Sequence, residues 1–162
     1  MLVLSSATVC CLKSWIGRSV RELILDLFVA GRPRTKGSLK VITPRGRKPL
    51  LVEDHALSKP WRIKVIKAIR AKYPHPPAVA NPVDVYLTFH FERLGPQART
   101  QDWPMVNAGV NAIGDLDKLE RNVLDAMEDA GVYVNDCQVV QLNTRKQWTQ
   151  DTPGVEIKVW AL

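Results

Sequence analysis

The stretch of residues 83–92 constrains the fold more than any other part of the chain. Apolar side chains at every second position alternate there with mostly polar ones, which is the pattern of a β-strand that buries one face. The apolar positions are Val83, Val85, Leu87, Phe89 and Phe91. Such a strand requires neighbouring strands in a sheet and a second layer that covers its apolar face.

Other segments provide the elements of that sheet and that layer. Sequence patterns predict strands at residues 22–29, 138–147 and 155–160, and helical spacing predicts helices from about residue 60 to 72 and from 117 to 130. The resulting order is β-α-β-α-β-β. This order predicts a single α+β (mixed α/β) domain with two main helices packed on a mixed β-sheet.

The second predicted helix has a buried stripe and a defined beginning. Because residues i and i+2 of a helix point to opposite sides, Asp115 and Asp117 face the same way only where the backbone is extended. The helix is therefore expected to begin at or just after Asp117, with Asp117 as N-cap and Glu120 three residues later. The stripe recurs at helical spacing and consists of Leu116, Leu119, Val123, Met127 and Ala130.

Three carboxylates flank this helix and indicate a metal site. Asp115 and Asp117 lie at its entrance, and Asp136 follows its end. Oxygen ligands of this kind suit hard divalent cations such as Mg²⁺, which act on phosphate groups. The site requires the next strand to bring Asp136 back to the helix entrance. Taken alone, an Asp-x-Asp pair is more often a solvated helix cap than a metal site.

Positive charge is concentrated in one part of the chain. Residues 31–73 hold 13 basic and two acidic side chains, so 13 − 2 gives +11, whereas the whole chain has a formal charge of +7. The other residues therefore carry 7 − 11 = −4. A basic segment beside an acidic, metal-ready one is what a nuclease requires, because one holds the polyanion and the other cleaves it.

The stretch of residues 31–49 is predicted to be an exposed loop that contacts DNA, because it combines Gly and Pro with positive charge. The basic residues of the helix at 60–72 are equally compatible with phosphate contact and with an ordinary solvated face. Lys146 shares a strand face with Val140 and Leu142, which suggests that this strand end opens to solvent or DNA. The candidates in the loop are Arg32, Arg34, Lys36, Arg45, Arg47 and Lys48.

The motif around the carboxylates resembles that of one known family. It consists of Gly114-Asp115-Leu116-Asp117-Lys118-Leu119-Glu120-Arg121, Leu124-Asp125-Ala126-Met127, Gly131, the aromatic Tyr133 and Asn135-Asp136-Cys137-Gln138-Val139-Val140. The pattern is similar to that of the RusA-type Holliday junction resolvases (crossover junction endodeoxyribonucleases) of bacteria and their phages. The similarity is sharpest over residues 114–140 and extends loosely over residues 23–162.

The resemblance implies roles for individual residues. Asp115, Asp117 and Asp136 match three aspartates that bind Mg²⁺ and are required for cleavage in the family. Arg121 matches a basic residue that matters one helical turn beyond the second aspartate. A basic residue is also frequent in the family at the position of Lys146, which makes Lys146 a candidate DNA contact.

Three positions depart from common family choices. The family often has Lys at the position of Arg121, and Arg can stabilise charge but cannot release a proton. Lys118 stands where Asn is frequent, and Asn135 stands where the family commonly has a second Asp. All three aspartates of the triad remain.

The resemblance also implies a function. A homodimer would resolve four-way junction DNA by Mg²⁺-dependent, paired symmetric nicks during recombination and repair. Two alternatives stay open: a catalytically inactive junction-binding protein, and a less specific nuclease that cleaves branched DNA.

The remaining features concern compartment and boundaries. The chain has three cysteines without metal-binding spacing, which favours reduced thiols and a cytoplasmic location. Residues 1–20 are interpreted as an N-terminal extension, either disordered or an upstream start, that precedes the RusA-like domain of residues 21–162. This extension lacks a positive leading region and is too short to span a membrane, so no membrane partner is expected.

Overall fold

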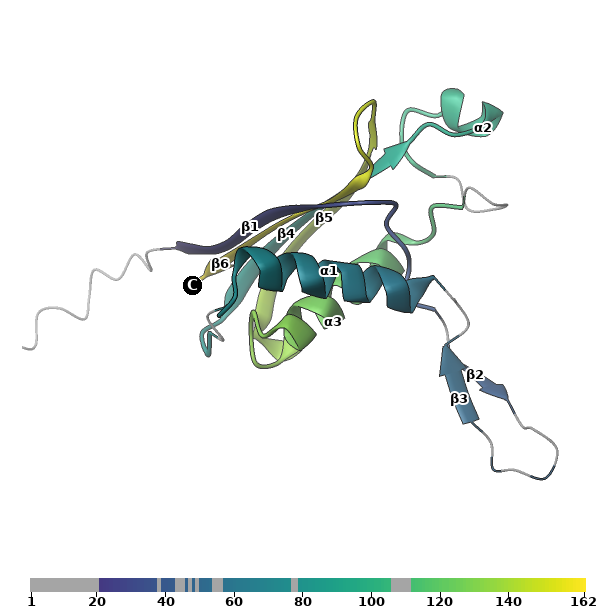
Figure 1. Cartoon of the computed structure of the whole chain (residues 1–162). Coiled ribbons are helices and arrows are strands. Elements are labelled where there is room, and N and C mark those ends of the chain that lie inside the picture. Colours follow the sequence, from purple (N-terminus) through teal and green to yellow (C-terminus); the bar gives the residue numbers. More distant parts are fainter. Residues whose placement is uncertain are drawn as a thin grey trace, which may run out of the picture.

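Four strands form one mixed sheet in the computed structural model of the chain (Figure 1). These strands are β1 (Glu22–Ala30), β4 (Val83–Glu92), β5 (Val139–Thr149) and β6 (Gly154–Ala161). Their order across the sheet is β1-β6-β4-β5. β6 pairs antiparallel with β1 and β4, whereas β4 and β5 are parallel, so the predicted mixed sheet is confirmed.

The structure describes most of the chain. The described residues are 21–37, 39–42, 46, 48, 50–53, 57–76, 79–105 and 112–162. The predicted N-terminal extension at residues 1–20 lies outside them.

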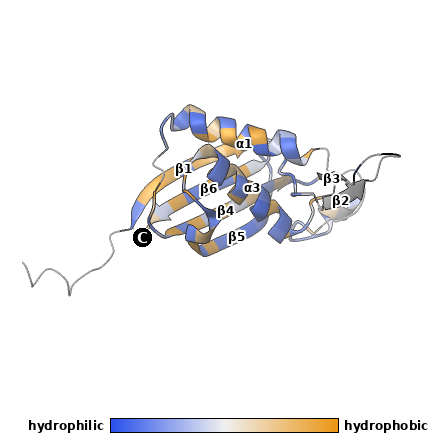
Figure 2. Cartoon of the chain, turned by 90° about the horizontal axis from the view of Figure 1, so that it is seen from below, coloured by the Kyte–Doolittle hydropathy of each residue, from blue (hydrophilic) through white to orange (hydrophobic). Residues whose placement is uncertain are grey.

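Two long helices, α1 (Ser58–Lys72) and α3 (Leu116–Ala130), cover one face of the sheet (Figure 1). The two helices also pack against each other. The outward surface of α3 is mostly hydrophilic (Figure 2). Among the helices of the described residues, none is long and apolar enough to cross a membrane. The predicted α+β domain with two main helices on a mixed sheet is thus confirmed.

The core lies between this helical layer and the sheet. The strand predicted at residues 83–92 has the same bounds as β4, and all of its apolar positions are buried. From the helices, the core receives Trp61, Val65, Ile69, Leu119, Val123, Met127 and Ala130. The predicted stripe of the second helix is therefore largely confirmed, although Leu116 is only partly buried.

Two regions predicted as irregular contain short elements. Part of the predicted basic loop forms an antiparallel hairpin of β2 (Leu39–Ile42) and β3 (Leu50–Glu53), which projects from the domain (Figure 1). The one-turn helix α2 (Pro96–Arg99) follows β4. Both were missed because their four-residue lengths are too short for a clear period amid turn-forming residues.

Strand β5 forms an edge of the sheet and has large exposed apolar side chains. Val140 is 57% exposed and Leu142 is 36% exposed. The turn of 3₁₀ helix η1 (Asp136–Gln138) comes directly before it. The pairing of β5 with β4 is irregular between Val139 and Gln141 and regular from Gln141 to Thr149, so the predicted shared face of Leu142 and Lys146 lies within the regular part.

Candidate functional site

The start of α3 carries two of the three predicted carboxylates. Gly114 has a positive φ of 81°, and Asp115 follows in extended conformation with φ −77° and ψ 145°. The helix begins at Leu116, so Asp115 is the N-cap and Asp117 lies in the first turn. The prediction of Asp117 as N-cap is wrong, because the chain turns into the helix immediately after the extended Asp115. The side chain of Asp115 makes no capping hydrogen bond, so the expected capping box with Glu120 is absent.

Asp115 and Asp117 are both exposed, and Asp115 is paired with a lysine. The Nζ atom of Lys118 lies 2.9 Å from Oδ2 of Asp115. This hydrogen bond lowers the pKa of Asp115 and raises the pKa of Lys118. Asp115 therefore stays ionised and already attracts a cationic group.

The basic segment after β1 packs against the first turns of α3. The backbone N–H of Lys36 donates to the carbonyl of Lys118 at 2.8 Å. The side-chain amide of Asn122 donates to the carbonyl of Arg34 at 2.9 Å and lies 3.3 Å from the Ser58 hydroxyl on α1. These bonds hold the backbone of the predicted DNA-binding residues Arg34 and Lys36 against the first two turns of α3.

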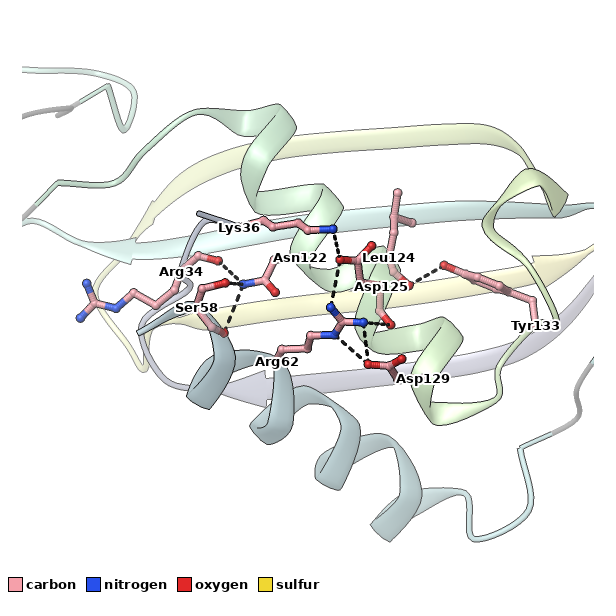
Figure 3. A network of polar contacts seen from close by, with 9 residues as sticks. All are labelled: Arg34, Lys36, Ser58, Arg62, Asn122, Leu124, Asp125, Asp129 and Tyr133. Atoms are coloured by element: carbon pink, nitrogen blue, oxygen red, sulfur yellow. Dashed lines mark hydrogen bonds and ion pairs between the residues drawn. The ribbon is translucent and has the colours of Figure 1, made fainter. Parts of the chain in front are cut away.

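The acidic side chains further along α3 neutralise some of this positive charge (Figure 3). Lys36 Nζ lies 2.5 Å from Oδ2 of Asp125, and Arg62 of α1 contacts the same oxygen at 3.1 Å. Arg62 also pairs with Asp129 at 2.6 Å. The guanidinium group of Arg34, by contrast, points away from this network (Figure 3). Arg34 is consequently better placed than Lys36 to contact a ligand.

Several basic residues of α1 have structural partners. Besides the pairs of Arg62, the guanidinium of Arg70 donates to the carbonyl of Asp129 at 2.7 Å. Lys72 donates to the carbonyl of Asp26 on β1. For these residues the structure favours a structural role, in which they hold α1 against α3 and the sheet. A role in phosphate contact is less favoured.

Lys146 reaches the site from β5. Its Nζ donates to the carbonyl of Gly114 at 3.1 Å, immediately before Asp115. Partial burial lowers the pKa of Lys146, while the nearby Asp115 opposes that shift. A Cβ atom on Gly114 would collide with the methyl group of Thr35, so this glycine is enclosed by the basic segment as well. The expectation that this strand end opens to solvent or DNA, with Lys146 as a DNA contact, stays a prediction.

The other predicted site residues lie as follows. Arg121 is exposed on α3, one helical turn beyond Asp117. Arg32 is half-buried at the end of β1, where burial and the neighbouring Arg34 lower the pKa of its guanidinium. Lys48 is exposed between the two hairpin strands. Arg45 and Arg47 lie outside the described residues.

Asp136 begins η1, and the preceding Asn135 caps this turn. The Asn135 side chain accepts a hydrogen bond from the Cys137 N–H at 2.9 Å, and the Gln138 side chain accepts one from the Asn135 N–H at 3.0 Å. Gln138 also donates to the carbonyl of Val79 at 2.7 Å. Asn135, which departs from the family pattern, thus has a structural role here, and Asp136 is presented on a fixed turn.

The structure does not bring Asp136 to the other two carboxylates within one chain. β5 begins at Val139, just after Asp136, whereas Lys146 of the same strand donates to the carbonyl of Gly114. Lys146 follows Val139 by seven positions along the strand, which is a span of about 23 Å. Asp136 therefore lies near the C-terminal end of α3, whereas Asp115 lies at its N-terminal end.

The donors at the start of α3 fit Mg²⁺ in an open site. Among the described residues, no three His, Cys, Asp or Glu side chains gather to hold a metal ion. Mg²⁺, however, usually keeps several waters and binds one or two carboxylates together with substrate phosphates. Asp115, in extended backbone, provides one such carboxylate, and Asp117 provides a second from the first helical turn, so the expected extended backbone at both residues is found only at Asp115. The Lys118 ammonium already takes a cation position beside Asp115. A closed cage that includes Asp136 of the same chain does not fit.

Sequence reasoning missed two residues that shape the site. Asn122 is buried and ties α3 to the basic segment and to α1. Its signal was a polar residue next to the predicted apolar stripe, at a spacing that faces the core. Gln138 anchors η1, and its signal was the Asn-x-x-Gln spacing of a capping box.

Comparison with known protein families shows which family the chain belongs to. It matches the family model described as endodeoxyribonuclease RusA over residues 30–160. The chain is therefore a member of the RusA endodeoxyribonuclease family, a family of DNA-cleaving hydrolases. No curated protein matches the chain.

Replacing Asn122 with Ala tests how the basic segment is held. We expect Asn122→Ala to lower the free energy of unfolding by about 1–3 kcal/mol, because it removes a buried donor from the Arg34 carbonyl. Hydrogen exchange of residues 31–37 should become faster. Urea unfolding and hydrogen-exchange mass spectrometry measure the two effects, with Asn143→Ala on exposed β5 as the control. Unchanged exchange in this segment would show that Asn122 does not anchor it.

Proposed function

We propose that the chain is a Mg²⁺-dependent endonuclease that resolves Holliday junctions by paired symmetric nicks. It would act in DNA recombination and repair, in the cytoplasm. The observation that supports the proposal is the pairing of two exposed carboxylates with two ammonium groups at one helix start. Lys118 and Lys146 place their ammonium groups at the start of α3, where Asp115 and Asp117 lie. This arrangement suits a metal ion shared between carboxylates and a phosphate group.

The basic segment and the hairpin would hold the DNA backbone. Arg34 directs its guanidinium away from the ion-pair network, so it is available to a phosphate (Figure 3). Lys48 lies in the projecting hairpin, and Arg32 stands at the base of the basic segment. Contacts of this kind position the substrate and carry no sequence information by themselves.

The residues of α3 would perform the cleavage step. A Mg²⁺ ion bound by Asp115 and Asp117 would polarise the scissile phosphate and lower the pKa of the attacking water. Arg121, one helical turn beyond Asp117, would hold phosphate oxygens bidentately and stabilise the negative charge that develops on them. Because a guanidinium group keeps its protons, Arg121 does not serve as an acid or a base.

We further propose a two-fold homodimer in which Asp136 acts on the site of the other copy. β5 is an edge strand, and Val134, Val140 and Leu142 around it are exposed apolar side chains of the kind that interfaces cover. Antiparallel pairing of two β5 edges would place the start of one strand beside the end of the other. Asp136 of one copy would then approach the end marked by Lys146, next to Asp115 of the second copy.

Replacing Asp117 tests the cleavage site. Asp117→Asn should abolish nicking of a labelled four-way junction in Mg²⁺ while leaving junction binding equal or tighter, because it removes a ligand and a negative charge near phosphate. The matched control is Asp151→Asn, which changes an exposed aspartate in the turn between β5 and β6. A gel assay that includes EDTA and a linear duplex of the same sequence measures both properties.

The outcomes separate the alternatives. Nicking by Asp117→Asn at the wild-type rate would remove Asp117 from the site. Wild-type binding without any Mg²⁺-dependent nicks would select the inactive junction-binding protein, and equal cleavage of flaps and four-way junctions would select the less specific branched-DNA nuclease.

Replacing Arg34 tests the DNA-binding surface. Arg34→Ala should flatten the salt dependence of junction binding by about one unit of log-log slope, because one phosphate contact is lost. Lys67→Ala, on the exposed side of α1, should leave the slope unchanged. Fluorescence anisotropy over a range of salt concentrations measures the slopes. Equal slopes for Arg34→Ala and wild type would place the DNA elsewhere.

Mixing two inactive variants tests the shared site. In a heterodimer of Asp117→Asn and Asp136→Asn, one site would keep both wild-type carboxylates and the other site would have neither. Random subunit exchange should therefore restore about one quarter of the wild-type sites, which give single nicks. Junction nicking before and after mixing measures this recovery. No recovery, with heterodimers confirmed by native mass spectrometry, would show that Asp136 does not act across the dimer.

A further inference from the structure

Lys118 lies where a metal ion would have to bind. Its ammonium group is 2.9 Å from Oδ2 of Asp115, and the i,i+3 spacing holds the two residues on one side of the first turn of α3. The side chains are 44% and 59% exposed, respectively, so ions and DNA can reach both. The positive charge of Lys118 thus competes directly with any cation for Asp115.

The Asp115 carboxylate has no capping function to perform instead. Its side chain makes no hydrogen bond to the first-turn N–H groups of α3, although Asp is a residue type that commonly does so at an N-cap. The backbone of Lys118 is fixed, because its carbonyl accepts the hydrogen bond from the Lys36 N–H. Its four-carbon side chain, however, is long and flexible, so the ammonium group can move while the helix stays in place.

The surroundings favour transfer of this ammonium group to a phosphate. Lys146 places a second ammonium group at Gly114, and the N-terminus of a 15-residue helix carries partial positive charge. A DNA phosphate drawn to this point would attract Lys118 away from Asp115. The released carboxylate and the phosphate would then be next to each other, which is how Mg²⁺ is usually held.

We propose that Lys118 is a tethered counter-ion that occupies Asp115 in the free protein and releases it to the metal ion when a DNA phosphate binds. This inference rests on the proposed function, because it takes Asp115 as a metal ligand. Its consequence is that DNA and the divalent cation strengthen each other's binding. The affinity of the site for the cation stays low until a substrate is bound. Cleavage is therefore limited to DNA whose phosphate is correctly placed.

The test measures cation binding rather than cleavage. Full-length wild type, Lys118→Gln and Asp115→Asn are titrated with Mn²⁺ in the absence of DNA, and free Mn²⁺ is counted by electron paramagnetic resonance. Lys118→Gln should bind Mn²⁺ about two- to fivefold more tightly than wild type, the range expected from loss of a partly exposed ion pair. The matched control is Lys158→Gln, which breaks an exposed lysine–glutamate pair of 2.7 Å on β6, away from α3.

A second measurement follows the coupling itself. The affinity for a labelled four-way junction is measured with Ca²⁺ in place of Mg²⁺, so that no cleavage occurs, and again with EDTA. Ca²⁺ should increase the affinity of wild type more than that of Lys118→Gln, by the same two- to fivefold factor. Lys158→Gln should behave as wild type.

The outcomes distinguish this inference from the proposed function. If Asp115→Asn loses Mn²⁺ while Lys118→Gln and wild type bind it equally, the counter-ion role is refuted and the metal site stands. If Asp115→Asn binds Mn²⁺ as wild type does, or if no variant binds Mn²⁺ and Ca²⁺ changes the junction affinity of none of them, both proposals are refuted.

Discussion

The buried side-chain amide of Asn122 joins α3 to two segments that pack against it. It lies between the carbonyl of Arg34 and the hydroxyl of Ser58, so it ties α3 to the basic segment and to α1 at once. A buried amide is costly unless its hydrogen bonds are made, which favours one arrangement of the three segments. The basic segment is thereby held against the first two turns of α3, the helix whose start carries Asp115 and Asp117.

The sequence was sufficient for the sheet and for the long helices, because their apolar patterns extend over six or more residues. The alternation of β4 and the stripe of α3 correspond directly to the buried core. The hairpin of β2 and β3 could not be predicted, because four-residue strands among Gly, Pro and basic residues have no clear period. The N-cap was misplaced by two residues, because the extended backbone that leads into the helix ends at Asp115 rather than at Asp117.

The site was predictable in composition but not in arrangement. The motif placed the two carboxylates together at the start of α3, and the charge balance placed basic residues near them. It could not show that α3 and β5 run in opposite directions along the domain. For that reason Asp136 stands at the far end of α3, and Lys146 rather than Asp136 is the residue of β5 that reaches Gly114.

Charge at the start of α3 is balanced between two kinds of ligand. In the proposed site, Lys118, Lys146 and the helix N-terminus would attract a phosphate, while Asp115 and Asp117 would attract a cation. In the free protein, the charges of Lys118 and Asp115 neutralise each other. A phosphate alone or a cation alone would therefore compete with this ion pair. Phosphate and cation together can satisfy both sets of groups. An isolated cation or an isolated phosphate must first break the ion pair, so this local geometry favours the combination that a DNA-cleaving enzyme needs.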